Sequence, residues 1–274
     1  MNQDQSRKYK DSVADYYSRR SADYDSSAWH VQIARKLVDF SNVHSGAQVL
    51  DICTGTGMVA LYAASKVGQN GAVIGVDISA GMLDKAIANT TAAGIPNVSF
   101  EMGDGENLSY APNTFDYIFC SSAFIWMTDL PAALLSWKEL LKPKGTLGFH
   151  AFSENAFVEG TVAQSVLSQY GVSYLMSKPT GTVEKCHALL EGAGYRNIRI
   201  EVDEASAYIG LEKAKRAWVS ALHPAPGQYP HPLTELTPAQ LIAAQKQYEH
   251  ELERRNTENG IVNDMTTLFH ATRF

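Results

Sequence analysis

Five short apolar runs of strand length recur along the first half of the chain, and four amphipathic segments of helix length alternate with most of them. The apolar runs lie at 48–53, 72–77, 97–104, 115–122 and 145–152. The amphipathic segments lie at 27–40, 57–67, 79–93 and 129–142. Strands that alternate with helices in this way predict an α/β protein whose mostly parallel sheet is covered by helices on both faces.

The pattern changes after Phe152. Helices are predicted at 156–169, 180–195, 212–222 and 238–256, with strands at 196–205 and 262–274. The segment "HPAPGQYPHP" contains four prolines, which preclude a helix or a central strand. We therefore assign the core to 46–152, a core helix and strand to 181–204 and a final core strand to 261–274, with cap insertions at 153–180 and 205–260.

Charge and composition narrow the classes of function. A net charge of −6 over 274 residues argues against broad nucleic-acid binding, which needs a basic face. No run approaches the roughly 18 apolar residues of a membrane span, and the polar N-terminus lacks the apolar centre of a signal peptide. The three cysteines form no CxxC pair, and no histidine spacing predicts a metal site. We expect a cytoplasmic protein without a bound metal.

The stretch "VLDICTGTGMVALYAA", Val49 to Ala64, reads as a strand, a glycine-rich turn and a helix. Backbone N–H groups at the start of such a helix favour anions, as in dinucleotide sites. Asp51 lies in the same loop and would repel a pyrophosphate. The loop therefore favours an adenosine ligand that lacks phosphates and carries positive charge, and S-adenosylmethionine has these properties.

Two further acids follow the next two strands. Asp77 ends the second strand, where a carboxylate can accept from both ribose hydroxyls, although dinucleotide enzymes use the same device. Asp104 ends the third strand, where it can accept from the adenine amino group. Either acid alone could be an ordinary loop or N-cap aspartate. Acids at three successive strand ends favour the cofactor, because ligands of open α/β sheets bind at these ends.

The motifs resemble those of class I S-adenosylmethionine-dependent methyltransferases, in the branch that contains the ubiquinone and menaquinone biosynthesis methyltransferases. "VLDICTGTG", "VIGVDIS", "GDGENL", "NTFDYIFCSSAFIWMTD" and "LKPKGTLGF" carry the likeness. The family often has a third glycine or alanine near Val59, whereas this chain has Ala60 one position later. The resemblance implies a Rossmann-like doubly wound sheet of seven strands, the last antiparallel.

The resemblance also assigns cofactor contacts residue by residue. Asp51 and Thr54, with the Gly55 and Gly57 backbone, are expected to hold the methionine moiety, and Ser121 to face its amino-acid end. Asp77 is expected to bind ribose. The adenine is expected to contact Ile78, Met82, Asp104 and Gly105. For Met82, a position in the helix core is the alternative.

The N-terminal stretch "DYYSRRSADYDSSAW" resembles the family's lid, which we place within 1–45. Tyr24 is expected to close over the cofactor, and Tyr17 to contact the methyl acceptor. An amphipathic helix that simply packs on the domain is the alternative. Phe124, Trp126 and His223 are further candidates for acceptor contacts, since aromatic walls suit small, partly apolar molecules. Here the alternative is that the aromatic residues form the cap's own core.

Methyl transfer from a sulfonium is an in-line displacement, so it depends mainly on holding the acceptor near the methyl group. His150, at the end of the fifth strand, is the candidate general base, unless it is only a hydrogen-bonded structural residue. The sequence predicts a methyltransferase that converts S-adenosylmethionine to S-adenosylhomocysteine, with O- or C-methylation favoured and N-methylation open. The alternatives are a non-catalytic protein that binds either compound and an NAD-dependent oxidoreductase. The acceptor and the oligomeric state are not identified.

Overall fold

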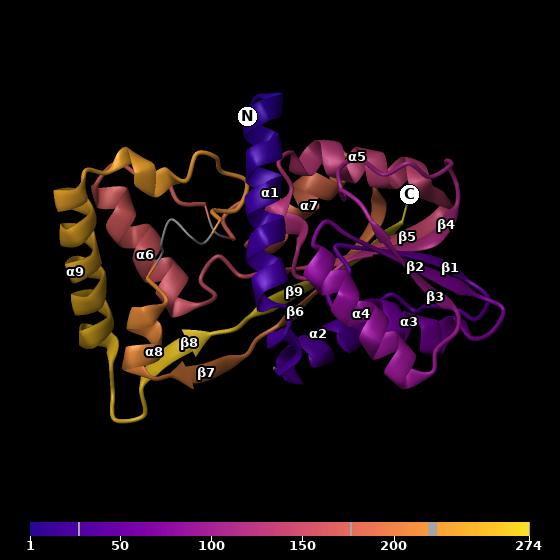
Figure 1. The fold of residues 1–274 in the computed structure, drawn as a ribbon, viewed down its shortest axis with the longest axis horizontal. Coiled ribbons are helices and arrows are strands. Elements are labelled where there is room, and N and C mark those ends of the chain that lie inside the picture. The colour runs from indigo at the N-terminus through magenta and orange to yellow at the C-terminus, as the bar shows by residue number, and fades with distance from the viewer. Residues whose placement is uncertain (27, 176, 219–223, 274) are drawn as a thin grey trace.

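A seven-stranded sheet forms the centre of the protein, of which the computed structural model describes residues 1–26, 28–175, 177–218 and 224–273 (Figure 1). Its strands are β1 (Gln48–Ile52), β2 (Ala72–Asp77), β3 (Val98–Met102), β4 (Phe115–Cys120), β5 (Leu141–Phe152), β6 (Arg196–Asp203) and β9 (Thr267–Arg273). They lie in the order β3-β2-β1-β4-β5-β9-β6. Of these seven strands, β9 alone runs in the opposite direction to the others, so the predicted Rossmann-like sheet with an antiparallel last strand is confirmed.

Helices cover both faces of this sheet. The helices α2 (Ala28–Phe40) and α3 (Met58–Val67) share one core with the sheet, and α5 (Leu130–Leu140) and α7 (Val183–Gly192) share another. α4 (Ala80–Ala93) lies beside β2 and β3. Local signals set the start of α4, because the Ser79 side chain accepts from the Met82 N–H as its N-cap. The strand order reverses between β1 and β4, where open α/β sheets bind ligands.

Three predicted elements differ from the structure. β5 begins at Leu141, directly after α5, rather than beyond Pro143. The helix predicted at 212–222 is α8 (Leu211–Arg216), and part of the predicted range lies outside the described residues. The predicted last strand is divided into β8 (Ile261–Asp264) and β9, because the chain turns where the Asp264 side chain accepts from the Thr266 N–H.

A second group of elements forms a cap beside the sheet. It contains α6 (Val158–Gln169), α8, α9 (Pro238–Arg255), the short helix η3 (Pro232–Glu235) and a two-stranded sheet of β7 (Ser206–Ile209) and β8. These elements bury a core of their own, with Val162, Val166, Tyr248 and Leu252 among its members. The chain passes from β6 into β7 and from β8 into β9, so the small sheet leads out of the large one toward the cap (Figure 1).

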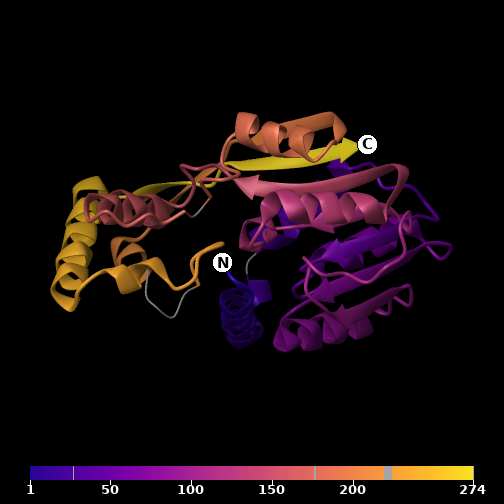
Figure 2. The ribbon, with the colours of Figure 1, turned by 90° about the horizontal axis from the view of Figure 1, so that it is seen from above.

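The N-terminal helix α1 (Gln3–Arg20) stands between the cap and the sheet in both views (Figures 1 and 2). Toward the core, the Ser18 and Ser79 hydroxyls hydrogen-bond to each other at 2.8 Å. Toward the cap, the Tyr9 hydroxyl accepts from the Gly227 N–H at 2.8 Å. The short helix η1 (Tyr24–Ser26) follows α1. Within the described ranges, no helix combines the length and apolar character needed to cross a membrane.

Candidate functional site

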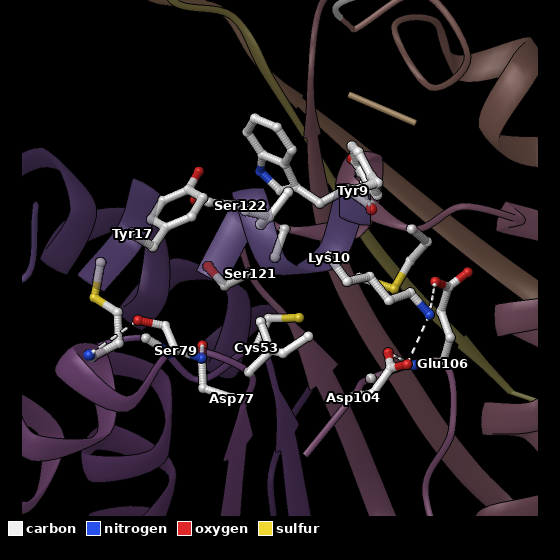
Figure 3. Close-up of a pocket in the computed structure, with 18 of the residues that line it drawn as sticks. Tyr9, Lys10, Tyr17, Cys53, Asp77, Ser79, Asp104, Glu106, Ser121 and Ser122 are labelled. Atoms are coloured by element: carbon white, nitrogen blue, oxygen red, sulfur yellow. Dashed lines mark hydrogen bonds and ion pairs between the residues drawn. The ribbon is translucent and has the colours of Figure 1, made fainter. Parts of the chain in front are cut away.

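A cavity with about 700 Å³ of empty space, counting the open solvent at its mouth, lies under α1 at the carboxyl ends of the first four strands (Figure 3). Its floor includes Cys53, Asp77, Asp104 and Ser121, which end or follow β1, β2, β3 and β4. α1 contributes Tyr9, Lys10, Val13 and Tyr17 to the opposite wall. A smaller cavity, with about 380 Å³ of empty space on the same measure, adjoins it at the glycine turn. The two cavities share Tyr24, Cys53, Gly55, Ser121 and Ser122.

The two glycines of the turn have different roles. Gly55 (φ 56°) lines both cavities, and a Cβ atom at this position would have no heavy atom within 4 Å. Gly57 (φ 84°) lines neither cavity; it begins α3, and a Cβ there would approach the Phe100 ring to 3.1 Å. The left-handed backbone at both positions favours glycine. Gly57 therefore shapes the predicted cofactor loop without facing either cavity.

Asp51 is buried at the smaller cavity, where one carboxylate oxygen accepts from the Thr54 hydroxyl at 2.6 Å and from the Ala60 N–H at 3.1 Å. Burial raises the pKa of Asp51 to about 7, although these hydrogen bonds act in the opposite direction. Neither Asp51 nor Asp77 has an ion-pair partner in the part of the chain that the structure describes. A cationic ligand would compensate their charge.

Asp77 lines the larger cavity and also holds the backbone around it. One carboxylate oxygen accepts from the Gly55 N–H at 2.8 Å, and the other accepts from the Ser79 N–H at 2.8 Å. Burial raises the pKa of Asp77, against the effect of these N–H groups. The next predicted residues, Ile78 and Met82, line the same cavity, and Met82 is also buried in α4.

Asp104 and Gly105 line the larger cavity as predicted, but the Asp104 carboxylate already has a partner. The Lys10 ammonium lies 2.7 Å from Asp104 and 2.8 Å from Glu106 (Figure 3). Burial by itself would lower the pKa of Lys10, but the hydrogen bonds to the two carboxylates outweigh it and raise that pKa. The predicted adenine-binding acid is thus part of a three-residue ion cluster that ties α1 to the core.

Tyr17, Tyr24 and Trp126 form an aromatic wall of the larger cavity. The Tyr17 ring meets Trp126 edge to face at 5.7 Å and Tyr24 at 6.2 Å. The Arg20 guanidinium lies over the rings of both tyrosines, at 5.6 and 5.7 Å. Burial raises the pKa of both phenols above the ordinary value, so both are neutral at pH 7. The structure therefore brings the predicted lid residues and Trp126 together at one cavity.

The structure corrects two predictions and leaves a third outside its range. His150 is 2% exposed and lines neither cavity, so it is not placed as a base in contact with the acceptor. Phe124 is 1% exposed and packs against Trp137 and Phe149, because the short helix that carries it turns its ring into the core. His223 lies outside the described residues.

Several cavity residues were not predicted, among them Tyr9, Lys10, Val13 and Ser122. The sequence contains a pattern that could have indicated the α1 residues: Tyr9, Val13 and Tyr17 are spaced four residues apart and so share one face of a helix. Ser122 carries no comparable signal, because its backbone angle and its histidine partner depend on the folded chain.

The smaller cavity also has buried polar atoms with unused hydrogen-bonding capacity. Thr56 Oγ1 and His30 Nδ1 belong to residues that line it, and neither atom has a hydrogen-bond partner in the described structure. Such atoms are usually paired in folded proteins, so they indicate a polar ligand group here. No cluster of three metal-ligating side chains occurs within the described ranges. A cationic ligand with polar ends fits the two cavities.

Comparisons with known proteins agree with a site for S-adenosylmethionine. Residues 43–213 match the family described as "Methyltransferase domain". Aklanonic acid methyltransferase DauC of Streptomyces sp. strain C5 is 30% identical over 211 residues, which cover 70% of this chain and 94% of that protein. Nocamycin O-methyltransferase of Saccharothrix syringae is 31% identical over 48% of both chains. Ubiquinone/menaquinone biosynthesis C-methyltransferase UbiE of Cellvibrio japonicus is 34% identical over 52% of this chain and 60% of that one.

Solved structures agree on the fold. A SAM-dependent methyltransferase from Aquifex aeolicus superposes with a TM-score of 0.55 at 20% identity, covering 69% of this chain and 92% of that one. The YcgJ protein of Bacillus subtilis superposes with a TM-score of 0.60 at 17% identity, covering 88% and 97%. At these identities the likeness concerns architecture alone.

Proposed function

We propose a small, partly apolar acceptor for this chain, which belongs to the methyltransferase-domain family of class I S-adenosylmethionine-dependent enzymes. The family membership sets aside the oxidoreductase and the non-catalytic alternatives. The aromatic wall carries the proposal about the acceptor: Tyr17 and Trp126 give one side of the cavity an apolar surface, opposite the acidic strand ends.

In this proposal the acidic side of the site holds the cofactor. Asp51, the glycine turn and Ser121 take the methionine end, and Asp77 takes the ribose. Ile78, Met82 and Gly105 enclose the adenine, with Asp104 at its edge. The buried Asp51 carboxylate has no cationic partner among the described residues, which supports the placing of the positively charged methionine end beside it. When bound, the cofactor supplies a methyl carbon that its sulfonium has already activated.

The chain's own residues position the acceptor and exclude water. α1 covers the cavity, and the Lys10 cluster and the Tyr9 hydroxyl hold it against the core and the cap. Enclosure of this kind favours a displacement that depends on alignment. No histidine in contact with the acceptor is part of this proposal, since burial lowers the pKa of His150 to about 3 and the side chain lines neither cavity.

Oxygen or carbon is the favoured methylated atom, because the names of two relatives specify O- and C-methylation. The test is to incubate the protein with methyl-labelled S-adenosylmethionine and panels of phenols, carboxylic acids, enolisable ketones, quinols and amines. S-adenosylhomocysteine formation and the labelled product are followed by mass spectrometry. Label on oxygen or carbon of an apolar acceptor supports the proposal. Label confined to the amines contradicts it.

A further inference from the structure

Ser122 and His150 form a hydrogen-bonded pair beside the two cavities. Ser122 follows β4 and lines both cavities, and its Oγ lies 2.9 Å from His150 Nε2 (Figure 3 labels Ser122). His150 lies on β5 and is 2% exposed. The Ser122 backbone has a φ of 58°, in the left-handed region that non-glycine residues rarely adopt. Strained backbone of this kind often marks a functional site.

The surroundings of the imidazole determine where its proton lies. His150 Nδ1 is buried and has no hydrogen-bond partner among the described residues. Its ring contacts Phe152 edge to face at 5.2 Å and Phe269 at 5.8 Å between ring centroids, and neither phenylalanine offers a hydrogen-bond acceptor to the imidazole. A proton on Nδ1 would leave a buried N–H unpaired, which is rarer in proteins than an unpaired acceptor. The proton therefore belongs on Nε2.

The ring is also neutral. Burial lowers the pKa of His150 to about 3, and the nearby His270 and His30 act in the same direction. His270 comes from β9 and stacks on Phe149, and His30 comes from α2. A neutral ring with its proton on Nε2 donates to Ser122 Oγ. That hydrogen bond occupies the Ser122 oxygen as an acceptor and leaves its hydroxyl proton for another group.

We propose that His150 is a positioning residue that fixes Ser122 as a hydrogen-bond donor to a ligand oxygen where the two cavities meet. Ser122 Oγ makes no other hydrogen bond with the described residues, so the hydroxyl proton can be donated to a ligand. The chemistry of that oxygen rests on the proposed function: it belongs either to the carboxylate of the cofactor's methionine end or to the acceptor. His150 does not remove a proton in this arrangement.

The tautomer is tested on the wild-type protein by nitrogen-15 NMR of the histidine rings, with His150→Gln used to assign the signal. We expect a protonated Nε2 and an unprotonated Nδ1, both unchanged between about pH 5.5 and pH 8.5. A proton on Nδ1, or a ring that titrates in this range, overturns the proposal. The measurement involves no methyl transfer, so it fails separately from the proposed function.

The donor role is tested with Ser122→Ala, using calorimetry with S-adenosylhomocysteine and turnover with an acceptor found in the labelling screen. A hydrogen bond to a charged oxygen predicts a loss of about tenfold or more. A loss of S-adenosylhomocysteine affinity assigns the oxygen to the cofactor, and a loss of turnover alone assigns it to the acceptor. Unchanged values in both assays overturn the proposal.

His150 variants separate positioning from packing. His150→Gln keeps a donor group and should retain most of the function, whereas His150→Leu should behave like Ser122→Ala. Ser65→Ala, which removes a hydroxyl on the exposed side of α3, is the matched control and should leave both assays unchanged. Equal losses in His150→Gln and His150→Leu would contradict the donor role. Thermal melting of each variant confirms that the protein is folded.

Discussion

Replacing Asp77 with alanine tests the double role of this carboxylate as a cavity residue and as a tether. Its two oxygens accept from the Gly55 and Ser79 N–H groups, both at 2.8 Å, and thereby join the glycine turn to the start of α4. Each N–H that loses its acceptor in a buried site costs about 1–3 kcal/mol. Water entering from the cavity would recover part of this cost, and removing the buried charge recovers more. We therefore expect Asp77→Ala to destabilise the ligand-free protein by about 2–3 kcal/mol.

In a protein of this size each kcal/mol shifts the melting temperature by about 2–4 °C, so the expected decrease is about 4–12 °C. Asp77→Asn keeps one accepting oxygen and should fall between Asp77→Ala and the wild type. The control is Asp84→Ala, since Asp84 is exposed on α4 and its replacement should shift stability by less than about 0.5 kcal/mol. Thermal and urea denaturation at pH 7 measure these values.

The pH dependence gives an independent check. Burial raises the pKa of Asp77 in the folded protein above its unfolded value, so the folded state binds this proton more tightly. The proton-linked part of the Asp77 contribution to stability is therefore present at low pH and is lost as the pH rises through the folded pKa, whereas the two N–H hydrogen bonds to the carboxylate remain at pH 7. Asp77→Ala should lose that pH dependence. If Asp77→Ala melts within about 1 °C of the wild type and binds S-adenosylhomocysteine equally well, both the tether and the ribose contact are refuted.

Three further predictions concern the lid and the buried acid. Lys10→Met should speed amide hydrogen exchange in α1 by about 5–30-fold, which corresponds to a loss of about 1–2 kcal/mol in the free energy of opening after allowance for solvent screening. Lys8→Met is the control and should not speed exchange, because its partner Asp4 is exposed. Equal effects of the two variants would contradict the role of the Lys10 cluster. Gly81→Ala places a Cβ 3.0 Å from Ser18 Cα and should weaken the packing of α1 on the core. Gly192→Ala is the control, because a Cβ there has no heavy atom within 4 Å. Slower amide hydrogen exchange in α1 of the Gly81→Ala variant would refute the close contact. Burial raises the pKa of Asp51 to about 7, so binding of cationic S-adenosylmethionine at pH 6.5, where the ligand's amino group is already protonated, should release about 0.7 proton from Asp51. Calorimetry in buffers of different ionisation enthalpy measures this release, and the absence of release at pH 6.5 would exclude Asp51 as its source. At pH 8.5 Asp51 should release almost none, and the ligand's amino group should take up protons instead.

Local signals made the core of the fold predictable. The run from Val49 to Ala64 contains a strand, a turn and a helix start within one short stretch, and Ser79 caps α4 through a partner three residues away. Such contacts form between near neighbours in the chain, so residue type and spacing are sufficient to indicate them. The three acids at successive strand ends were predictable for the same reason, since parallel strands bring their carboxyl ends to one edge.

The division of the C-terminal segment and the burial of His150 were not predictable in this way. β8 pairs with β7, a strand some fifty residues earlier that sequence periodicity does not reveal. His150 was expected to face the acceptor because it lies near the end of a strand, but its ring is buried against Phe152 and Phe269 and hydrogen-bonds to Ser122, which lines both cavities. Strand periodicity indicates that successive side chains alternate between faces, and it does not show what covers each face.

The sequence by itself determined the sheet, the order of its helices and the chemistry of the methyl donor, because these depend on short-range patterns and on residues at strand ends. Only the tertiary structure decided how the site is closed. Lys10 meets Asp104 across 94 residues of chain, and Tyr9 meets Gly227 across 218. Contacts over such separations depend on how whole elements pack, and no local propensity encodes them. In the sequence the N-terminal segment resembled a lid, with an amphipathic helix as the alternative, whereas α1 and its partners appear only in the folded protein.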